Sequence, residues 1–305
     1  MSDPTSAAPL RRTRRSVREQ VILFLLAAAA AISVFITVGI VATLFGEGTS
    51  FFSEVSVSDF LFGTTWSPTD QQWGVLPLLF GSIKIAVLAG CVAIPLGVGS
   101  AIYLSEYAPE RVRRIIKPVL EMLAGLPTIV LGYFALTTLT PSLHALGIVP
   151  EGQPFSALSA GIVVGLLILP LVSSLSEEAI RAVPRSLREG AYGLGATKPT
   201  VCMRVVVPAG LSGIVASCVL GLSRAVGETM AVTMAAGLVP NLSLDPRSDG
   251  QTITSYIVQV VRGEAPRGST QYGSIFAVGI LLFVLTFAIN MIAVRIVRRY
   301  RAVYQ

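Results

Sequence analysis

The sequence predicts an all-α membrane protein with six transmembrane helices. Of its 305 residues, 53% are hydrophobic and only 13% are charged, and its mean hydropathy of +0.73 is outside the range of soluble domains. Six apolar stretches reach the roughly 20 residues that a helix needs to cross a bilayer. They are residues 21–45, 75–104, 119–140, 155–180, 205–236 and 274–297. Their pattern suits helices rather than the alternating strands of a membrane barrel.

The distribution of lysine and arginine assigns both termini to the cytoplasm. Of the 23 basic residues, 18 lie in the N-terminal arm, the second and fourth connections, or the C-terminal tail from Arg295 onward. With six crossings these segments share one side of the membrane, and basic residues are enriched on the cytoplasmic side. The same bias accounts for the net charge of +6, so nucleic-acid binding is not expected.

The first apolar stretch is expected to stay as a helix rather than to be removed as a signal peptide, because it exceeds the ~7–15-residue core of such peptides. The predicted parts are a basic cytoplasmic arm at 1–20, the first transmembrane helix at 21–45, an external loop at 46–74, and the other five helices within 75–300, with a cytoplasmic helix at about 184–196. In the external loop, Trp66 and Trp73 are expected at the lipid headgroup level, where tryptophan is enriched.

The fifth stretch carries the strongest candidate for a functional site. Arg224 and Glu228 lie four residues apart within an otherwise apolar run, so one continuous helix would place them on one face, where they can pair. An arginine near the bilayer centre costs about 2.5–3.5 kcal/mol and normally faces protein or a water-filled path. We therefore predict that Arg224 binds an anion and that Glu228 orients and screens it. The alternative is an ion pair that only fixes helix packing.

Other polar residues in the apolar stretches have weaker functional indications. Thr128 follows Pro127, which frees a backbone carbonyl, so the two can line a polar pathway or simply mark a bend. Lys84 is expected to extend to the outer surface, with attraction of anions as the alternative. His144 is the only histidine, and the three cysteines suggest neither a disulfide nor a metal site. No catalytic constellation and no nucleotide-binding loop are found in the sequence.

A short amphipathic helix is predicted in the cytoplasmic connection at about 184–196. Ser186 and Glu189 have the spacing of a capping box, and Gly195 can end the helix in the left-handed conformation.

This segment also resembles a known motif. Glu189-Gly190-Ala191, followed by Gly195 and then by Val205-x-Val207-Pro208, is similar to the EAA loop of ABC importer permeases, with Gly190 in place of alanine and valines in place of isoleucine and leucine. In that family the loop forms a coupling helix that docks on an ATPase subunit, so the resemblance assigns this contact to Glu189, Gly190, Ala191 and Gly195.

The stretch from Arg224 to Val232, Arg-Ala-Val-Gly-Glu-Thr-Met-Ala-Val, resembles the signature of phosphate-specific ABC permeases of the PstC type. The PstA-type partner typically has Ala-Pro where this chain has Met230-Ala231. Further similarities begin near Trp66 and continue to the C-terminus. The resemblance implies the type I ABC importer architecture and location in a prokaryotic plasma membrane. It also implies a PstA-type second permease, two PstB-type ATPase subunits that hold ATP and magnesium, and a PstS-type external phosphate-binding protein, with no cofactor in this chain.

These observations lead to a hypothesis in which Arg224 holds phosphate weakly and transiently, Glu228 accepts a hydrogen bond from a protonated phosphate oxygen, and Thr128 contributes to the path. Three alternatives remain at this stage. They are a permease for another oxyanion or small solute, a secondary carrier that uses Glu228 as a proton site, and a membrane-embedded enzyme.

Overall fold

The computed structural model describes residues 17–263 and 265–301, and the side chains up to residue 297. Residues 1–16 of the predicted basic arm lie outside the described residues. The chain forms two units, Met1–Gly46 and Glu47–Gln305. Helix α1 (Val17–Glu54) includes the predicted first span and continues beyond it at both ends.

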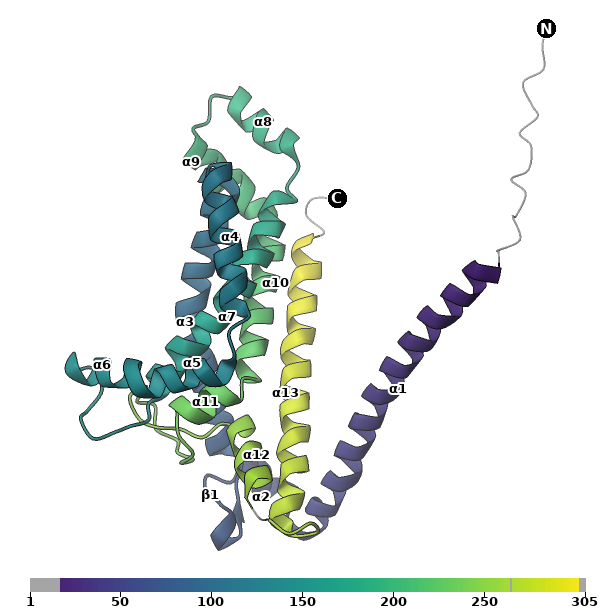
Figure 1. Ribbon diagram of the computed structural model, residues 1–305, viewed down its shortest axis with the longest axis vertical. Helices are drawn as coiled ribbons and strands as arrows, with labels where there is room; N and C mark the ends of the chain where they lie inside the picture. The colour runs from purple at the N-terminus through teal and green to yellow at the C-terminus, as the bar shows by residue number, and fades with distance from the viewer. Residues whose placement is uncertain (1–16, 264, 302–305) are drawn as a thin grey trace. The chain divides into compact units, whose positions relative to one another are not determined.

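Four long helices of the second unit run side by side (Figure 1). They are α3 (Leu76–Ile102), α7 (Ala157–Arg181), α10 (Val207–Val226) and α13 (Thr270–Arg301). Helix α7 packs against both α3 and α10, and α13 packs against α10. Small residues permit this close approach: Gly165 of α7 lies directly against Val92 and the Ala89 carbonyl of α3, so no Cβ would fit there. With α1, the described residues contain five unbroken helices long and apolar enough to cross a membrane.

The third span in chain order is broken rather than straight. The single helix predicted at 119–140 is therefore wrong, whereas the bend that the sequence indicated at Pro127 as one alternative is confirmed. Helix α4 (Glu110–Ala124) is followed by α5 (Thr128–Phe134), a π-helical turn (Ala135–Leu139) and α6 (Thr140–Ala145). The two parts are bent by 90° relative to each other. Pro127 lies at the break as the N-cap of α5, and a proline disfavours helical backbone in the residue before it, so α4 ends ahead of it. If the bent pair is one span, the chain has the six spans that the sequence predicts.

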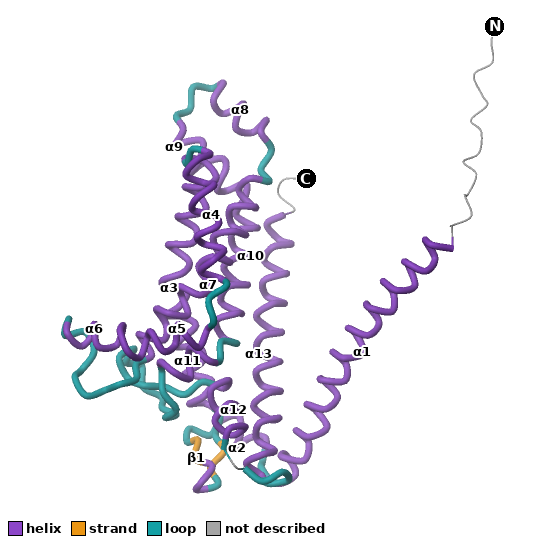
Figure 2. The backbone as a smooth tube through the Cα atoms, viewed as in Figure 1, coloured by secondary structure: helices purple, strands orange, loops and turns teal. Residues whose placement is uncertain are grey.

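The ends of the bundle carry the short elements (Figure 2). On the side assigned to the cytoplasm are α8 (Arg185–Gly193) and α9 (Lys198–Val201), with π-helical turns at Tyr103–Tyr107 and Cys202–Val206. On the outer side are α2 (Val57–Phe62), the antiparallel pair β1 (Trp66–Ser67) and β2 (Gln72–Trp73) joined by a 3-10 turn (Pro68–Asp70), α11 (Met230–Ala235) and α12 (Ile253–Arg262).

The outer elements are held together by an aromatic cluster. Trp66 and Trp73 are both buried, with their rings edge-to-face at 5.6 Å, and Tyr256 lies 4.8 Å from the Trp66 ring. The expectation that the two tryptophans lie among lipid headgroups is therefore wrong. Phe51 and Phe60 complete the cluster, so the indole rings stabilise the outer end of the protein instead of its contact with lipid.

Candidate functional site

The fifth span ends at a break that separates the two charged residues of the predicted site. Arg224 lies in the last turn of α10, which ends at Val226, and α11 begins at Met230. Non-helical backbone at membrane depth is tolerated only where it is buried in protein or lines a water-filled cavity. The break is braced from a distant part of the chain, because the Thr254 hydroxyl of α12 donates to the Glu228 carbonyl at 2.8 Å.

Glu228 caps the second helix instead of pairing with Arg224. Its Oε1 accepts a hydrogen bond from the Ala231 N–H at 3.3 Å, which satisfies one free donor at the start of α11. The break removes the continuous helix on which the predicted pair depends, and no Arg224–Glu228 ion pair forms. Within the described part of the chain, the Arg224 side chain is exposed and has neither a hydrogen bond nor an ion pair. A charged group in this position needs water or a second chain next to it in the membrane.

Thr128 lies at the other broken span. It is the first residue of α5, directly after Pro127, and it is half-buried. Helix α5 packs along α11 (Figure 1), and Gly132 approaches the backbone of Ala231 so closely that a Cβ would collide with it. The structure thus brings the two helix breaks into one region: Thr128 begins a helix that packs on the one that Glu228 caps.

The predicted cytoplasmic helix is present as α8, and its end follows the prediction. Gly195 has a φ of +81°. The Gly195 N–H donates to the Tyr192 carbonyl at 2.9 Å and the Ala196 N–H to the Ala191 carbonyl at 3.1 Å. This is the Schellman arrangement, which favours glycine at its left-handed position. The start differs from the prediction: Pro184 is the N-cap, so Ser186 lies inside the helix and forms no capping box.

Helix α8 presents an exposed surface. None of its residues is buried, and Leu194 just beyond it is 91% exposed. Glu189 and Tyr192 line a polar pocket of about 410 Å³ at the base of the helix. Exposed apolar side chains next to charged ones are typical of a surface that contacts another protein. Of the residues assigned to coupling by the motif, Glu189, Gly190 and Ala191 therefore lie on one short, accessible helix, and Gly195 lies in the turn that ends it.

A buried carboxylate ties the broken third span to the bundle. Glu177 of α7 is only 2% exposed and lies against three cations, of which Arg113 of α4 is the most buried, at 14%. The Nη2 of Arg113 donates to Glu177 Oε1. Lys117 Nζ is 3.7 Å from Oε2, and Arg181 Nη1 is 3.6 Å from Oε1. The sequence reasoning missed this group, although Glu177 and Arg181 are one helical turn apart, the usual spacing of a helical ion pair.

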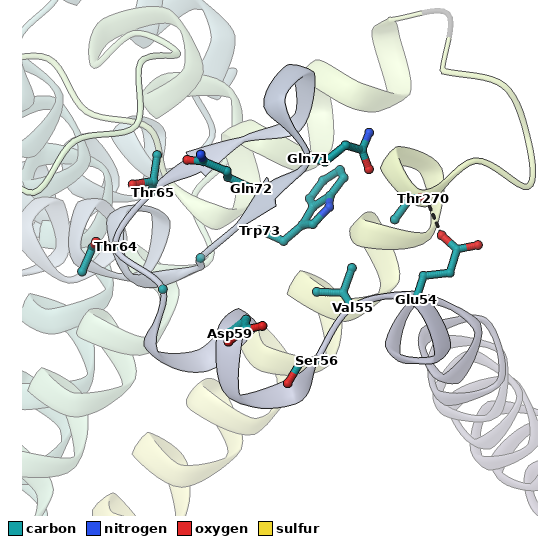
Figure 3. A pocket seen from close by; sticks show the side chains of 12 residues that line it. Glu54, Val55, Ser56, Asp59, Thr64, Thr65, Gln71, Gln72, Trp73 and Thr270 are labelled. Atoms are coloured by element: carbon teal, nitrogen blue, oxygen red, sulfur yellow. Dashed lines mark hydrogen bonds between the residues drawn. The ribbon is translucent and has the colours of Figure 1, made fainter.

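A second pocket, of about 480 Å³, lies on the outer side (Figure 3). Most of the side chains that line it are polar, including the carboxylates of Glu54 and Asp59, and Trp73 and Val55 supply its apolar side chains. The Thr270 hydroxyl donates to Glu54 across its rim. None of Arg224, Glu228 and Thr128 lines this pocket, so it is separate from the predicted anion site.

Lys84 is a structural anchor for the outer loop at 237–252. Its Nζ donates to the Ser243 carbonyl at 3.2 Å, the Ser248 hydroxyl at 3.2 Å and the Asp249 carbonyl at 3.4 Å. The same loop accepts a hydrogen bond at 2.9 Å from the Ala157 N–H at the start of α7. The side chain is therefore held within the protein rather than extended to the outer surface as expected.

The loop also contains an ion pair whose acid has a lowered pKa. The Arg247 guanidinium donates to both carboxylate oxygens of Asp245, and these hydrogen bonds lower the pKa of Asp245 from 3.8 to about 2. Because the folded pKa is below the unfolded value, the pair contributes to stability above about pH 4, and this contribution is lost as the pH falls through 2. Arg247 thus has an acidic partner, whereas Arg224 has none among the residues that the structure describes.

Replacing Lys84 by Met is expected to loosen the loop at 237–252. The substitution keeps a long apolar stem but removes the three hydrogen bonds to the loop. Amide hydrogen exchange should therefore accelerate in residues 237–252 and stay unchanged in the helix cores. Arg262→Met is the control, since Arg262 is an exposed outer cation with no such contact. Equal exchange in the Lys84→Met variant and the unaltered protein would contradict the anchoring role.

Comparisons with known proteins agree on the class of protein. Residues 93–302 match the family described as binding-protein-dependent transport system inner membrane component. The probable ABC transporter permease protein YqgH of Bacillus subtilis is 35% identical over 267 residues, which cover 87% of this chain and 84% of that protein. The phosphate transport system permease protein PstC of Xylella fastidiosa is 34% identical over 251 residues, which cover 77% of this chain and 76% of that protein.

A solved structure shares the fold. A bacterial alginate ABC transporter, crystallised with an alginate-bound periplasmic protein, contains a chain that superposes with a TM-score of 0.64 over 92% of this chain and 96% of its own. The sequence identity is 14%, so this likeness concerns the fold alone. It agrees with the type I ABC importer architecture implied by the sequence.

Proposed function

This chain belongs to the family of binding-protein-dependent transport system inner membrane components and, within it, to the PstC-type phosphate permeases, and we propose that Arg224 is its transient phosphate site. The protein is a multi-pass permease subunit of the plasma membrane in an ABC importer of inorganic phosphate. It is a transport subunit rather than an enzyme.

The observation that carries the site proposal is the state of Arg224. It is an exposed guanidinium without a partner among the described residues, at the end of a membrane-spanning helix and next to a break in that helix. In the assembled transporter this face turns toward the second permease and a water-filled path, where the guanidinium holds two phosphate oxygens by charge-assisted hydrogen bonds. The affinity of the site for phosphate is low in this proposal, because an anion whose hydrogen bonds were all supplied by the protein would not be released.

Glu228 and Thr128 act beside Arg224. Because Glu228 is fixed by its cap on α11, its carboxylate is preorganised at the break and accepts a hydrogen bond from a protonated phosphate oxygen. Sulfate, which has no such proton near neutral pH, leaves this acceptor unpaired and is disfavoured. The Thr128 hydroxyl supplies a further polar group at the start of α5.

The energy for transport comes from other subunits. In this proposal two PstB-type ATPase subunits bind ATP and magnesium, and Glu189, Gly190, Ala191 and Gly195 on and after α8 dock on one of them. A PstA-type permease forms the other half of the path, and a PstS-type external protein delivers phosphate. Closure of the ATPase pair moves α8 and changes the access of the Arg224 site from the outer to the inner side.

Uptake in cells tests this proposal. Cells without phosphate transporters of their own, supplied with this chain and its presumed partners, should accumulate labelled phosphate. Omitting this chain, or an ATPase subunit, should abolish accumulation. Equal uptake without the ATPase subunits would contradict ATP-driven import.

A further inference from the structure

Arg188 of α8 joins three segments of the cytoplasmic side. Its Nη1 donates to the Val183 carbonyl at 2.7 Å, and its Nη2 donates to the Ile180 carbonyl at 2.8 Å and to Glu106 Oε1 at 3.0 Å. The Arg188 and Glu106 side chains are only 18% and 10% exposed. The first two bonds fix α8 to the end of α7, and the third fixes it to the end of α3, a helix more than 80 residues earlier in the chain.

A second contact holds the same end of α3. Lys198, the first residue of α9, places its Nζ 5.0 Å from the centre of the Tyr107 ring, which is a cation–π distance. Glu106 and Tyr107 are neighbours in the π-helical turn Tyr103–Tyr107 that ends α3. The cytoplasmic connection therefore holds one turn of α3 at two points, by a side chain from α8 and a side chain from α9.

Helix α3 extends from this turn to the outer loop. It packs along α7 and α10, and its Lys84 binds the loop at 237–252. Helix α10 carries Arg224. A displacement of the cytoplasmic end of α3 would thus reach both the helix that carries the anion site and the loop at the outer side, because packed helices move as rigid elements.

We propose that the Arg188–Glu106 ion pair passes the movement of α8 to α3, and that it thereby sets how much ATP hydrolysis is converted into transport. Both are positioning residues that act on the site through α3. The inference rests on the proposed function, in which α8 docks on an ATPase subunit that moves when the ATPase pair closes. It adds a defined route by which that movement enters the bundle.

The two ends of the Arg188 contact can be separated by mutation. Glu106→Ala removes the link to α3 and leaves the bonds from Arg188 to the Ile180 and Val183 carbonyls intact. Arg188→Gln removes the link to α3 and also the guanidinium bonds to the Ile180 and Val183 carbonyls. A role confined to capping α7 would make only the second variant defective, whereas transmission to α3 requires a defect in both.

The test is transport per ATP hydrolysed, measured with the complete complex in proteoliposomes. Glu106→Ala should lower phosphate transported per ATP by about tenfold, a size typical of a coupling contact, while the complex assembles and hydrolyses ATP at nearly its usual rate. Arg114→Gln is the matched control, because it removes an exposed charge on the same side. Unchanged transport per ATP in Glu106→Ala, or an equal loss in Arg114→Gln, would overturn the proposal.

A distance measurement tests the contact without transport. Spin labels at Arg185→Cys on α8 and Tyr103→Cys at the end of α3, with the three native cysteines replaced by serine, report how the two segments move. ATP binding to the complex should leave their separation unchanged, and it should change the separation in Glu106→Ala. An ATP-dependent change in the distance between the two spin labels in the protein that keeps Glu106 would overturn the proposal. Loss of ATP-dependent phosphate uptake in the unaltered complex would instead contradict the proposed function.

Discussion

Replacement of Arg224 by Gln is expected to reduce phosphate uptake by about a hundredfold or more, because each hydrogen bond to a charged group contributes about 1.5–3 kcal/mol and the forked guanidinium supplies two. Glutamine retains a polar side chain but neither the charge nor the fork. Within the described part of the chain Arg224 has no hydrogen-bond or ion-pair partner, so its replacement leaves no other group unpaired. Assembly of the complex should therefore persist. The measurement is labelled phosphate uptake, normalised to assembled complex.

Two further variants sharpen this result. Arg224→Lys keeps the charge without the planar fork and should give intermediate uptake. Arg262→Gln removes an exposed cation of α12 on the outer side and should be near normal. Full uptake by Arg224→Gln would show that phosphate does not use this guanidinium, whatever the behaviour of the two controls.

Replacement of Glu177 by Ala should have the largest effect on stability. Glu177 is the shared partner of three cations from α4 and α7, and Arg113 would be left largely buried without a counterion. Removing one partner of a buried pair costs about 3 kcal/mol or somewhat more. The variant should therefore unfold at lower temperature in detergent, and α4 should detach from α7 before the rest of the bundle opens.

The neighbouring residue provides a matched control for this prediction. Glu178 is exposed, so Glu178→Ala removes the same charge from the same helix without disturbing the buried cluster. The Glu178→Ala variant should unfold at the same temperature as the unaltered protein. Equal unfolding temperatures for Glu177→Ala and Glu178→Ala would show that the cluster does not hold α4 to α7.

The six spans could be predicted because burial in lipid imposes long apolar runs, and Gly195 could be predicted because few residues adopt its left-handed backbone conformation. The break after Val226 was missed, although Gly227, Glu228 and Thr229 interrupt the apolar run at 205–236, because polar residues within such a run fit a continuous helix equally well. What stabilises the break is the Thr254 hydroxyl, 26 residues further along the chain. The same limit applies to Glu106 and Arg188, whose contact depends on how α3 and α8 meet in three dimensions.

The predicted pairing of Arg224 with Glu228 is wrong in its geometry, while their role at a substrate site stays a prediction. Four-residue spacing predicts a pair only on a continuous helix. Once the helix ends at Val226, Glu228 becomes a cap for α11 and the guanidinium is left available for another anion. The break thus replaces a self-satisfied ion pair by a basic group that can bind cargo, which favours a substrate role over a purely structural one.

The most direct test is phosphate uptake into proteoliposomes that contain this chain with its second permease, ATPase subunits and external binding protein, with ATP on the ATPase side and excess sulfate outside. Uptake that requires ATP and persists in sulfate is the predicted result. Uptake driven by a proton gradient without ATP would contradict the ATP-driven mechanism, and complete inhibition by sulfate would contradict the proposed selection of a protonated anion by Glu228.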